Sequence, residues 1–118
     1  MSGKWHLGIN HANQDQKFTP NSHGYEDYLG SPYTNAPMCA PDKDGVSRKH
    51  KEGPNFCFLQ ANGTVVEQPL RLENFTAAIT KHGVEFIHRQ QQQKPWFLFM
   101  SYFHVHSPLF GRFQFKNN

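Results

Sequence analysis

Lys4 and His6 are the first residues whose types and spacing suit chemistry. They lie two positions apart in the segment 3–8, Gly-Lys-Trp-His-Leu-Gly, so an extended backbone would point both side chains the same way. A cation and an imidazole that converge in this manner suit the oxygens of a tetrahedral oxyanion. The pattern fits two ordinary solvated residues equally, and both interpretations stay open at this point.

His104 and His106 form the second candidate, because they follow the apolar run 96–103. In open α/β sheets, ligands bind beyond the carboxyl ends of the strands. Alternation along a strand would place both histidines on one face, and this spacing also suits a zinc pair. No third zinc ligand can be identified. The pair therefore remains open between an anion contact, a zinc pair and two structural histidines.

The helix and strands that would position these residues predict an α/β fold. Apolar residues such as Phe75 and Ile79 recur at helical spacing between residues 72 and 89, although Gly83 weakens this helix, and Pro95 prevents its continuation. The run 96–103 is almost unbroken in apolar character and suits a parallel strand covered on both faces. Residues 64–67 predict a short strand. A helix followed by a buried strand is half of a βαβ unit.

Residues 10–55 read as a long loop region, punctuated by Pro and Gly and anchored by tyrosines such as Tyr28. A disulfide between Cys39 and Cys57 would close part of this region and stabilise the fold by ~3 kcal/mol. Two free thiols would suit a cytosolic chain better. Residues 42–45, Asp-Lys-Asp-Gly, begin like a calcium loop but lack its later acidic positions, so they predict a turn.

The charge and composition exclude several classes of function. The net charge is +3 and the basic residues are scattered, so we expect no nucleic-acid partner. No stretch reaches the ~20 apolar residues of a membrane span, and the first eight residues contain no signal-peptide core. Glycosylation sequons begin at Asn62 and Asn74, and with the cysteines they fit an oxidising, secretory compartment. We therefore expect either a cytosolic chain or a start further upstream.

Three of these segments together resemble the sulfatase family. Residues 3–8 are similar to its second signature. Residues 23–34, His-Gly-Tyr-Glu-Asp-Tyr-Leu-Gly-Ser-Pro-Tyr-Thr, resemble the His-Gly-Phe-Asp-x-x-x-Gly-x-Pro-Tyr-Ser segment of the arylsulfatase group. Residues 103–110 look like the family strand whose last histidine faces the substrate, which here is His106. The resemblance covers residues 1–110 as part of a sulfatase catalytic domain and leaves 111–118 as a divergent tail.

The resemblance implies an alkaline-phosphatase-like α/β sandwich that hydrolyses sulfate esters with a formylglycine nucleophile and calcium. Lys4 would bind a sulfate oxygen, and His6 would orient or deprotonate the nucleophile. His106 would contact the sulfate on the leaving-group side, and Thr34 stands where the family has a sulfate-contacting serine. The partner would be a sulfated small molecule, glycan or lipid, and the compartment the lysosome or the cell exterior. A similar pairing of Cys39 with Cys57 is expected in this group.

Some parts of the family pattern are absent. The formylglycine signature Cys-x-Pro-Ser-Arg does not occur, no paired Asp precedes Lys4, and no Asp-Asn follows His106. We therefore expect this chain alone to lack the nucleophile and the calcium ligands, to be inactive and to fold only marginally. One alternative is a non-catalytic product that binds sulfated ligands or regulates a sulfatase. Another is a small His-rich metal protein.

Overall fold

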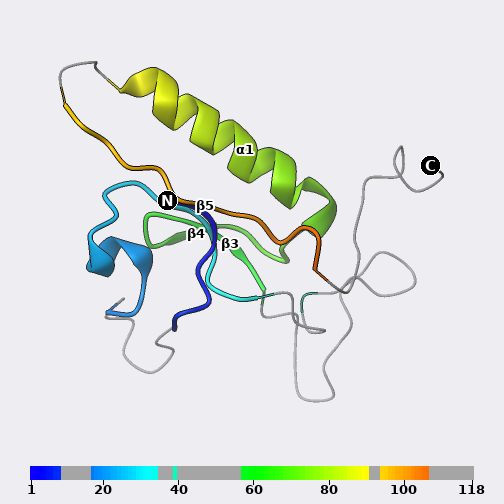
Figure 1. The fold of residues 1–118 in the computed structure, drawn as a ribbon. Coiled ribbons are helices and arrows are strands. Elements are labelled where there is room, and N and C mark those ends of the chain that lie inside the picture. The colour runs from blue at the N-terminus through cyan, green and yellow to red at the C-terminus, as the bar shows by residue number, and fades with distance from the viewer. Residues whose placement is uncertain (9–16, 35–38, 40–56, 91–93, 107–118) are drawn as a thin grey trace.

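One helix packs against a five-stranded mixed sheet in the computed structural model, which describes residues 1–8, 17–34, 39, 57–90 and 94–106 (Figure 1). Across the sheet the strand order is β4-β3-β2-β1-β5. The elements are β1 (Ser2–Lys4), a 3₁₀ helix η1 (Pro20–His23), β2 (Leu29–Ser31), β3 (Leu59–Ala61), β4 (Thr64–Glu67), α1 (Leu72–Arg89) and β5 (Met100–Ser101). The helix 72–89 and the strand 64–67 are confirmed, and so is the α/β class.

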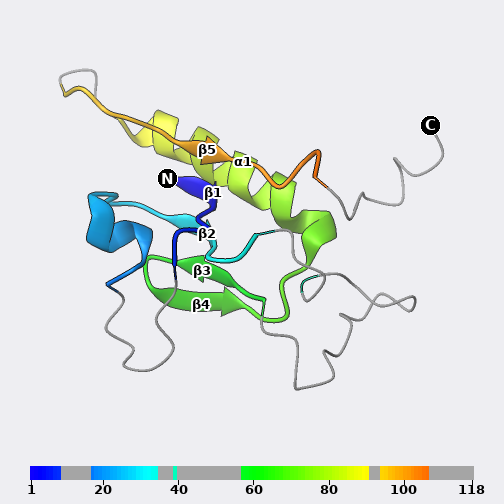
Figure 2. The same ribbon diagram turned by 60° about the horizontal axis from the view of Figure 1, so that its bottom comes forward.

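β1 lies between two parallel neighbours. Ser2 pairs with Leu29 of β2 on one side and with Met100 of β5 on the other. The carboxyl ends of these three strands therefore meet at one edge of the sheet. β3 and β4 continue the sheet beyond β2 as an antiparallel hairpin (Figure 2). The hairpin turns at Asn62 and Gly63, whose φ angles of 44° and 85° suit the tightest type of hairpin turn.

Two glycines allow the parallel strands to lie so close together. A Cβ atom on Gly3 would stand 1.9 Å from the carbonyl oxygen of Ser101 in β5. A Cβ atom on Gly30 would stand 1.8 Å from the carbonyl oxygen of Gly3. Gly3 also has a φ of 120°, which residues other than glycine rarely adopt. Glycine is therefore required on both sides of the junction between β1 and its neighbours.

The main core lies between α1 and the disulfide. Leu72, Phe75 and Ile79 form the buried stripe of α1, and the ring of Phe75 lies 4.5 Å from that of Phe103, centroid to centroid. Gly83 extends this stripe, and a Cβ atom there would be 2.7 Å from Sδ of Met100. The glycine that weakens the helix thus allows it to approach the β5 segment. The remaining members of this cluster are Cys39, Cys57, Leu59 and Leu70.

The strand predicted at 96–103 is shorter than expected. Only Met100 and Ser101 pair in the sheet, parallel to β1 as predicted, and among the described residues no strand lies beyond β5. Four of the rings in this segment are 40–71% exposed, namely Trp96, Phe97, Phe99 and Tyr102. This exposure agrees with the expectation that the segment needs further neighbours to cover both of its faces.

A polar network joins α1 to the amino side of the sheet. The buried Ser2 hydroxyl donates to the Ile79 carbonyl at 2.7 Å, and Nδ1 of His82 lies 3.2 Å from the same hydroxyl. Nε2 of His82 is 3.1 Å from Oδ1 of Asp27, and Arg89 donates to Oδ2 of Asp27 at 2.5 Å. Burial alone would raise the pKa of Asp27, but the hydrogen bond with His82 and the charges of His82 and Arg89 outweigh it and lower that pKa.

Several predictions concern residues outside the described parts of the chain. They are the turn at 42–45, most of the loop region 10–55 and the divergent tail 111–118. Inside the loop region, the structure describes η1 and β2, and Tyr28 is fully buried as an anchor. Within the described residues, no helix has the length and apolar character to cross a membrane.

Replacing Gly3 by Ala should destabilise the fold through the collision with Ser101 in addition to backbone strain. We expect a loss in the free energy of unfolding of about 1–3 kcal/mol, measured by urea denaturation. Gly24→Ala is the matched control, because Gly24 has a φ of 88° but nothing lies within 4 Å of its added Cβ. Equal losses in the two variants would show that the close approach at Gly3 is unimportant.

Replacing Asp27 by Asn should lower stability at neutral pH and not at strongly acid pH. Because folding lowers the pKa of this carboxyl below 3.8, its contribution is present above that pH and is lost as the pH falls further. At pH 7 we expect a loss of about 1.5 kcal/mol, the low end of the range for charged hydrogen bonds because Arg89 is half exposed. Urea unfolding between pH 2 and 7 measures the difference, and a pH-independent gap would contradict this assignment.

Candidate functional site

The segments that follow β1 and β2 lie side by side at the carboxyl edge of the sheet. The backbone amide of Trp5 donates to the Ser31 carbonyl at 2.9 Å, and that of His6 donates to the Pro32 carbonyl at 3.1 Å. Lys4, the last residue of β1, is half-buried, whereas the His6 side chain is exposed. These contacts bring Lys4 and His6 to the same edge as the residues that follow β2.

The backbone of His6 does not continue the strand. Its φ of 59° lies in the left-handed region, which few residues other than glycine adopt. The extended backbone on which the alignment of His6 with Lys4 was predicted therefore ends at Lys4, and a bend in the chain follows it. Such strained conformations persist only where the surrounding contacts hold them. The alignment of the two side chains stays a prediction.

Thr34 lies three residues beyond β2 and is half-buried. The preceding Tyr33 ring packs edge-on against Phe58 at a centroid distance of 5.5 Å, and burial raises the pKa of the Tyr33 hydroxyl. Sγ of Cys39 is 3.7 Å from the carbonyl oxygen of Thr34. The turn that carries Thr34 is thus held between an aromatic contact and a cystine.

The disulfide is confirmed. Cys39 and Cys57 are bonded, their Cα atoms are 5.3 Å apart, and both are almost completely buried. They are the two cysteines of the chain, so neither is a free thiol. The cystine joins the segment after β2 to the start of the β3–β4 hairpin.

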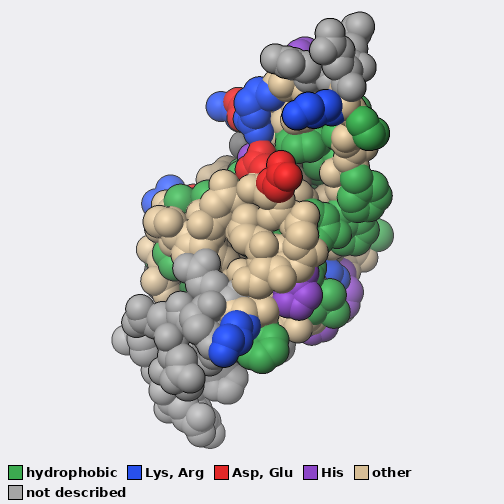
Figure 3. All heavy atoms as spheres, turned by 90° about the vertical axis from the view of Figure 1, so that its left-hand side faces the viewer, with side chains coloured by type: hydrophobic (Ala, Val, Ile, Leu, Met, Phe, Trp, Pro, Cys, Tyr) green, Lys and Arg blue, Asp and Glu red, His purple; other side chains and the backbone are tan. Residues whose placement is uncertain are grey.

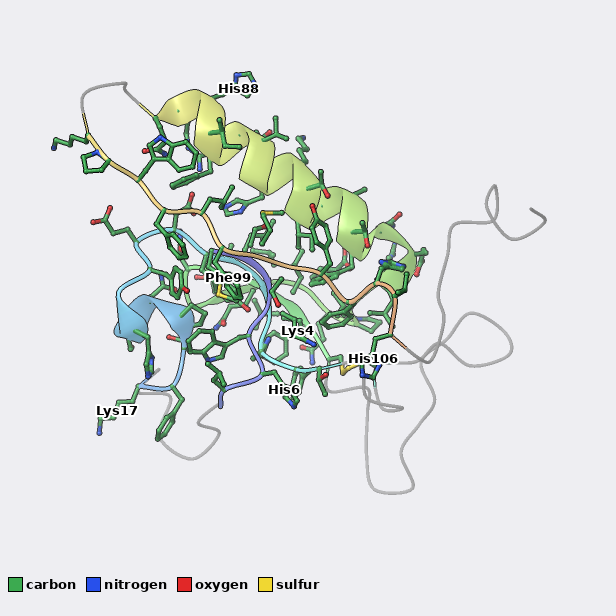
Figure 4. All side chains as sticks on the ribbon, in the orientation of Figure 1. Lys4, His6, Lys17, His88, Phe99 and His106 are labelled. Atoms are coloured by element: carbon green, nitrogen blue, oxygen red, sulfur yellow. A yellow bond between two sulfur atoms is a disulfide. The ribbon has the colours of Figure 1, made fainter. Side chains whose placement is uncertain are left out.

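His104 and His106 lie in a turn that follows β5. The backbone amide of His106 donates to the Phe103 carbonyl at 3.0 Å, and Nδ1 of His104 lies 2.5 Å from Oγ1 of Thr76 on α1. The strand has already ended at Ser101, so strand alternation does not apply to these two histidines, and their placement on one face stays a prediction. In Figure 4, Lys4 lies at the carboxyl end of the parallel strands, and His6 and His106 lie beyond it.

The described residues do not hold a metal site. Across 1–8, 17–34, 39, 57–90 and 94–106, no three side chains of His, Cys, Asp or Glu are grouped closely enough to bind a metal ion. The zinc pair at His104 and His106 consequently gains no third ligand from this part of the molecule. The calcium that the family resemblance implies has no ligand set there either, so we assign no chemical step to a metal.

Ser2, His82 and Asp27 form a row that sequence reasoning missed. Its composition is that of a hydrolase triad, but its geometry is not. Ser2 is fully buried, and its hydroxyl proton is directed at the Ile79 carbonyl rather than at His82. A nucleophile must be accessible and must lose its proton to the histidine. The row is therefore a structural contact between α1 and the sheet.

A hollow of about 800 Å³ lies at the opposite edge of the sheet from Lys4. Its lining includes Tyr25, Glu26, Arg89 and Trp96, which lie near the amino ends of β2 and β5 and the end of α1. Figure 3 views this side of the molecule and shows acidic side chains between basic and hydrophobic ones. None of the site residues predicted from the sequence lines this hollow.

Comparison with known proteins identifies the family of this chain. The family model described as Sulfatase matches residues 1–118. The chain belongs to the sulfatase family. An arylsulfatase of Hemicentrotus pulcherrimus is 36% identical over 98% of this chain and 21% of its own length. Arylsulfatase G of Mus musculus is 31% identical over 92% of this chain and 23% of its own length.

The human steryl-sulfatase is a more distant relative, 24% identical over 94% of this chain and 28% of its own length. No solved structure gives a significant match. This member of the sulfatase family thus spans about a fifth to a quarter of the length of the first two relatives.

Removing the cystine of this sulfatase chain by the double change Cys39→Ser and Cys57→Ser should lower the free energy of unfolding by ~3 kcal/mol. The two cysteines are 18 positions apart, and opening that loop increases the freedom of the unfolded chain. Urea denaturation with and without dithiothreitol measures the effect. If reductant left the unfolding midpoint of the unmodified chain unchanged, the cystine would not stabilise the fold.

Proposed function

We propose that this chain supplies the sulfate-binding part of a sulfuric ester hydrolase of the arylsulfatase type. The observation that carries the proposal is the convergence of three parallel strands whose carboxyl ends lead into Lys4, Thr34 and His106. Ligands of open α/β sheets bind at this edge. Membership of the sulfatase family selects sulfate among the tetrahedral anions.

Lys4 is proposed to bind a sulfate oxygen as a fixed positive charge. Lys4 is half-buried at the end of β1, and an ion pair beside protein is stronger than one in bulk solvent. Thr34 adds a hydroxyl donor from the turn held by the cystine. A charge and a neutral donor aimed at the same oxyanion stabilise it in the ground state and, more strongly, as charge develops.

The two histidines are proposed to act on opposite sides of the sulfur. His6 would orient or deprotonate the nucleophile, and His106 would donate a proton to the departing oxygen. Imidazole suits both roles because it gains and loses a proton near neutral pH. The nucleophile itself is not assigned to this chain, because Cys39 and Cys57 are bonded to each other and neither stands in the formylglycine signature.

The substrate is proposed to be the sulfate ester of an aryl or other small molecule, or of a glycan or lipid. The relatives are named as arylsulfatases and a steryl-sulfatase, which supports organic sulfates as the class. Calcium and formylglycine belong to the proposal only as family features, because no described residue is assigned to them.

A secretory or lysosomal location is part of the proposal, and Asn62 is the better candidate for glycosylation. Asn62 is exposed at the hairpin turn, and its Oδ1 accepts hydrogen bonds from the Tyr28 amide at 2.7 Å and from Asn21 at 3.2 Å. A glycan attaches to the nitrogen of the side-chain amide, so these bonds to the oxygen could persist. Asn74 is half-buried in the first turn of α1, which makes it the less accessible acceptor.

A second candidate function is the binding of sulfated ligands without turnover, as a non-catalytic or regulatory product. The same three residues would carry it, so binding alone does not separate it from the first. Restoration of aryl sulfate hydrolysis by a fragment of a related sulfatase that contains the formylglycine signature would favour the first candidate. Binding that persists with no such restoration would favour the second.

The proposed site predicts that Lys4→Ala and His106→Ala each weaken the binding of sulfate or an aryl sulfate by about tenfold or more, the value of a charge-assisted hydrogen bond. Calorimetry or NMR titration of the full chain measures the affinity. Lys17→Ala and His88→Ala are the matched controls, because these exposed residues lie away from the site in Figure 4. They should leave the affinity unchanged.

Hydrolysis of an aryl sulfate by the chain alone, with calcium added, should not exceed that of the Lys4→Ala, His106→Ala double variant. Turnover above that background would contradict the expected inactivity.

In the binding experiment, an equal loss of affinity in the Lys17→Ala control would refute the site and leave only a general effect of charge.

A further inference from the structure

The segment that leads into β5 is covered by α1 on one face only. Leu98 and Met100 turn toward the helix, where a Cβ atom on Gly83 would lie 3.7 Å from Cδ2 of Leu98 and 2.7 Å from Sδ of Met100. Phe97 and Phe99 alternate with them along the extended chain, and their rings are 71% and 44% exposed. Figure 4 shows Phe99 on the side away from α1. One apolar face of this segment is therefore left open to solvent.

The outer edge of β5 is open as well. β1 lies along the inner edge, where the Ser2 amide donates to the Phe99 carbonyl at 2.9 Å. Backbone groups of successive residues in a strand point to opposite edges, so the N–H and C=O of Met100 point away from β1. In the described part of the chain, the sheet ends at β5 and supplies no strand to pair with these groups. Such an edge is a template for another strand.

Charged side chains border this apolar surface near the amino end of β5. Phe97 and its neighbour Trp96, which is 49% exposed, both line the hollow of about 800 Å³ described above. The lining of the same hollow includes Glu26, Arg89 and Lys94. An exposed apolar patch with a polar rim is typical of a surface that binds another protein segment.

We propose that the outer edge of β5 and the open face of Phe97 and Phe99 are a docking surface for the rest of a sulfatase domain. The occupant would add an apolar strand beside Met100 and cover the two rings. The Sulfatase family model matches the whole chain, yet the chain spans only 21% and 23% of the two arylsulfatase relatives. The larger part of such a relative supplies the partner. This inference rests on family membership and is independent of the proposed anion site.

A second copy of this chain fits the surface less well. β5 contains two residues, so pairing of two β5 edges about a two-fold axis would form a very short ladder. Strands that pair edge to edge also leave the faces of the sheet uncovered, and the rings of Phe97 and Phe99 would stay in water. A partner that supplies both a strand and an apolar cover satisfies the edge and the face together.

β4 forms the opposite edge of the sheet and provides a matched control. Val65 and Val66 are 46% and 53% exposed, similar to Phe99. The strand ends at the charged Glu67, and charged side chains at an edge discourage further pairing. The double changes Phe97→Thr with Phe99→Thr, and Val65→Thr with Val66→Thr, each remove two exposed apolar side chains and introduce a residue that suits strands.

The test compares the full chain with a chimera in which it replaces the matching segment of the Hemicentrotus pulcherrimus arylsulfatase. In the chain alone, both double changes should leave the urea midpoint of unfolding unchanged, because the four side chains are already exposed to water. In the chimera, the change at Phe97 and Phe99 should lower the midpoint or prevent secretion, and the valine change should do neither. Exchange of the Met100 amide, followed by mass spectrometry, should be about tenfold slower or more in the chimera.

Several results would overturn the proposal. If the change at Phe97 and Phe99 lowered the midpoint of the chain alone as much as that of the chimera, the two rings would already belong to its core. A chimera that does not fold, or that tolerates this change, would show that the surface does not receive the rest of the domain. A dimer of the chain alone, seen by sedimentation and abolished by the same change, would assign the surface to a second copy. Sulfate binding enters none of these measurements, so the anion site and the docking surface can fail separately.

Discussion

The close approach of β1 to both of its neighbours is the constraint on which the rest of this structure depends. Gly3 and Gly30 lie where a single Cβ atom would stand within 2 Å of the next strand's carbonyl. This spacing brings the carboxyl ends of β1, β2 and β5 to one edge, although their residues are far apart in the chain. Lys4, Thr34 and His106 lie near that edge because Gly3 and Gly30 have no side chain to keep the strands apart.

The features predicted correctly from the sequence are those with a strong local signal. The helix at 72–89 has apolar periodicity and a proline after it, and the two cysteines have only each other as partners. β1 and β2 are three residues long and contain glycine, so they are too short to show any periodicity. The candidate site came from resemblance to family segments, because Lys-x-His spacing alone fits many surfaces.

Two predictions about side-chain direction assumed longer strands than those that form. Alternation along a strand was used to align Lys4 with His6 and His104 with His106, but β1 ends at Lys4 and β5 ends at Ser101. The bend at His6 and the turn at 103–106 are held by contacts with the segment after β2 and with α1. Contacts of this kind join residues that are distant in sequence, so local pattern contains no trace of them.

The pairing of β1 with β5 has a consequence for how the molecule assembles. Ser2 lies opposite Met100, so the ladder between β1 and β5 joins residues about a hundred positions apart, and its contact order is high. The hairpin of β3 and β4 and the helix α1 need only near neighbours and can form early. The ladder that completes the candidate anion site must wait for the slow closure of the longest loop. Binding of the anion would therefore report on the last step of folding. A chain could have nearly all of its helix content while the pairing of β1 with β5 was still not formed.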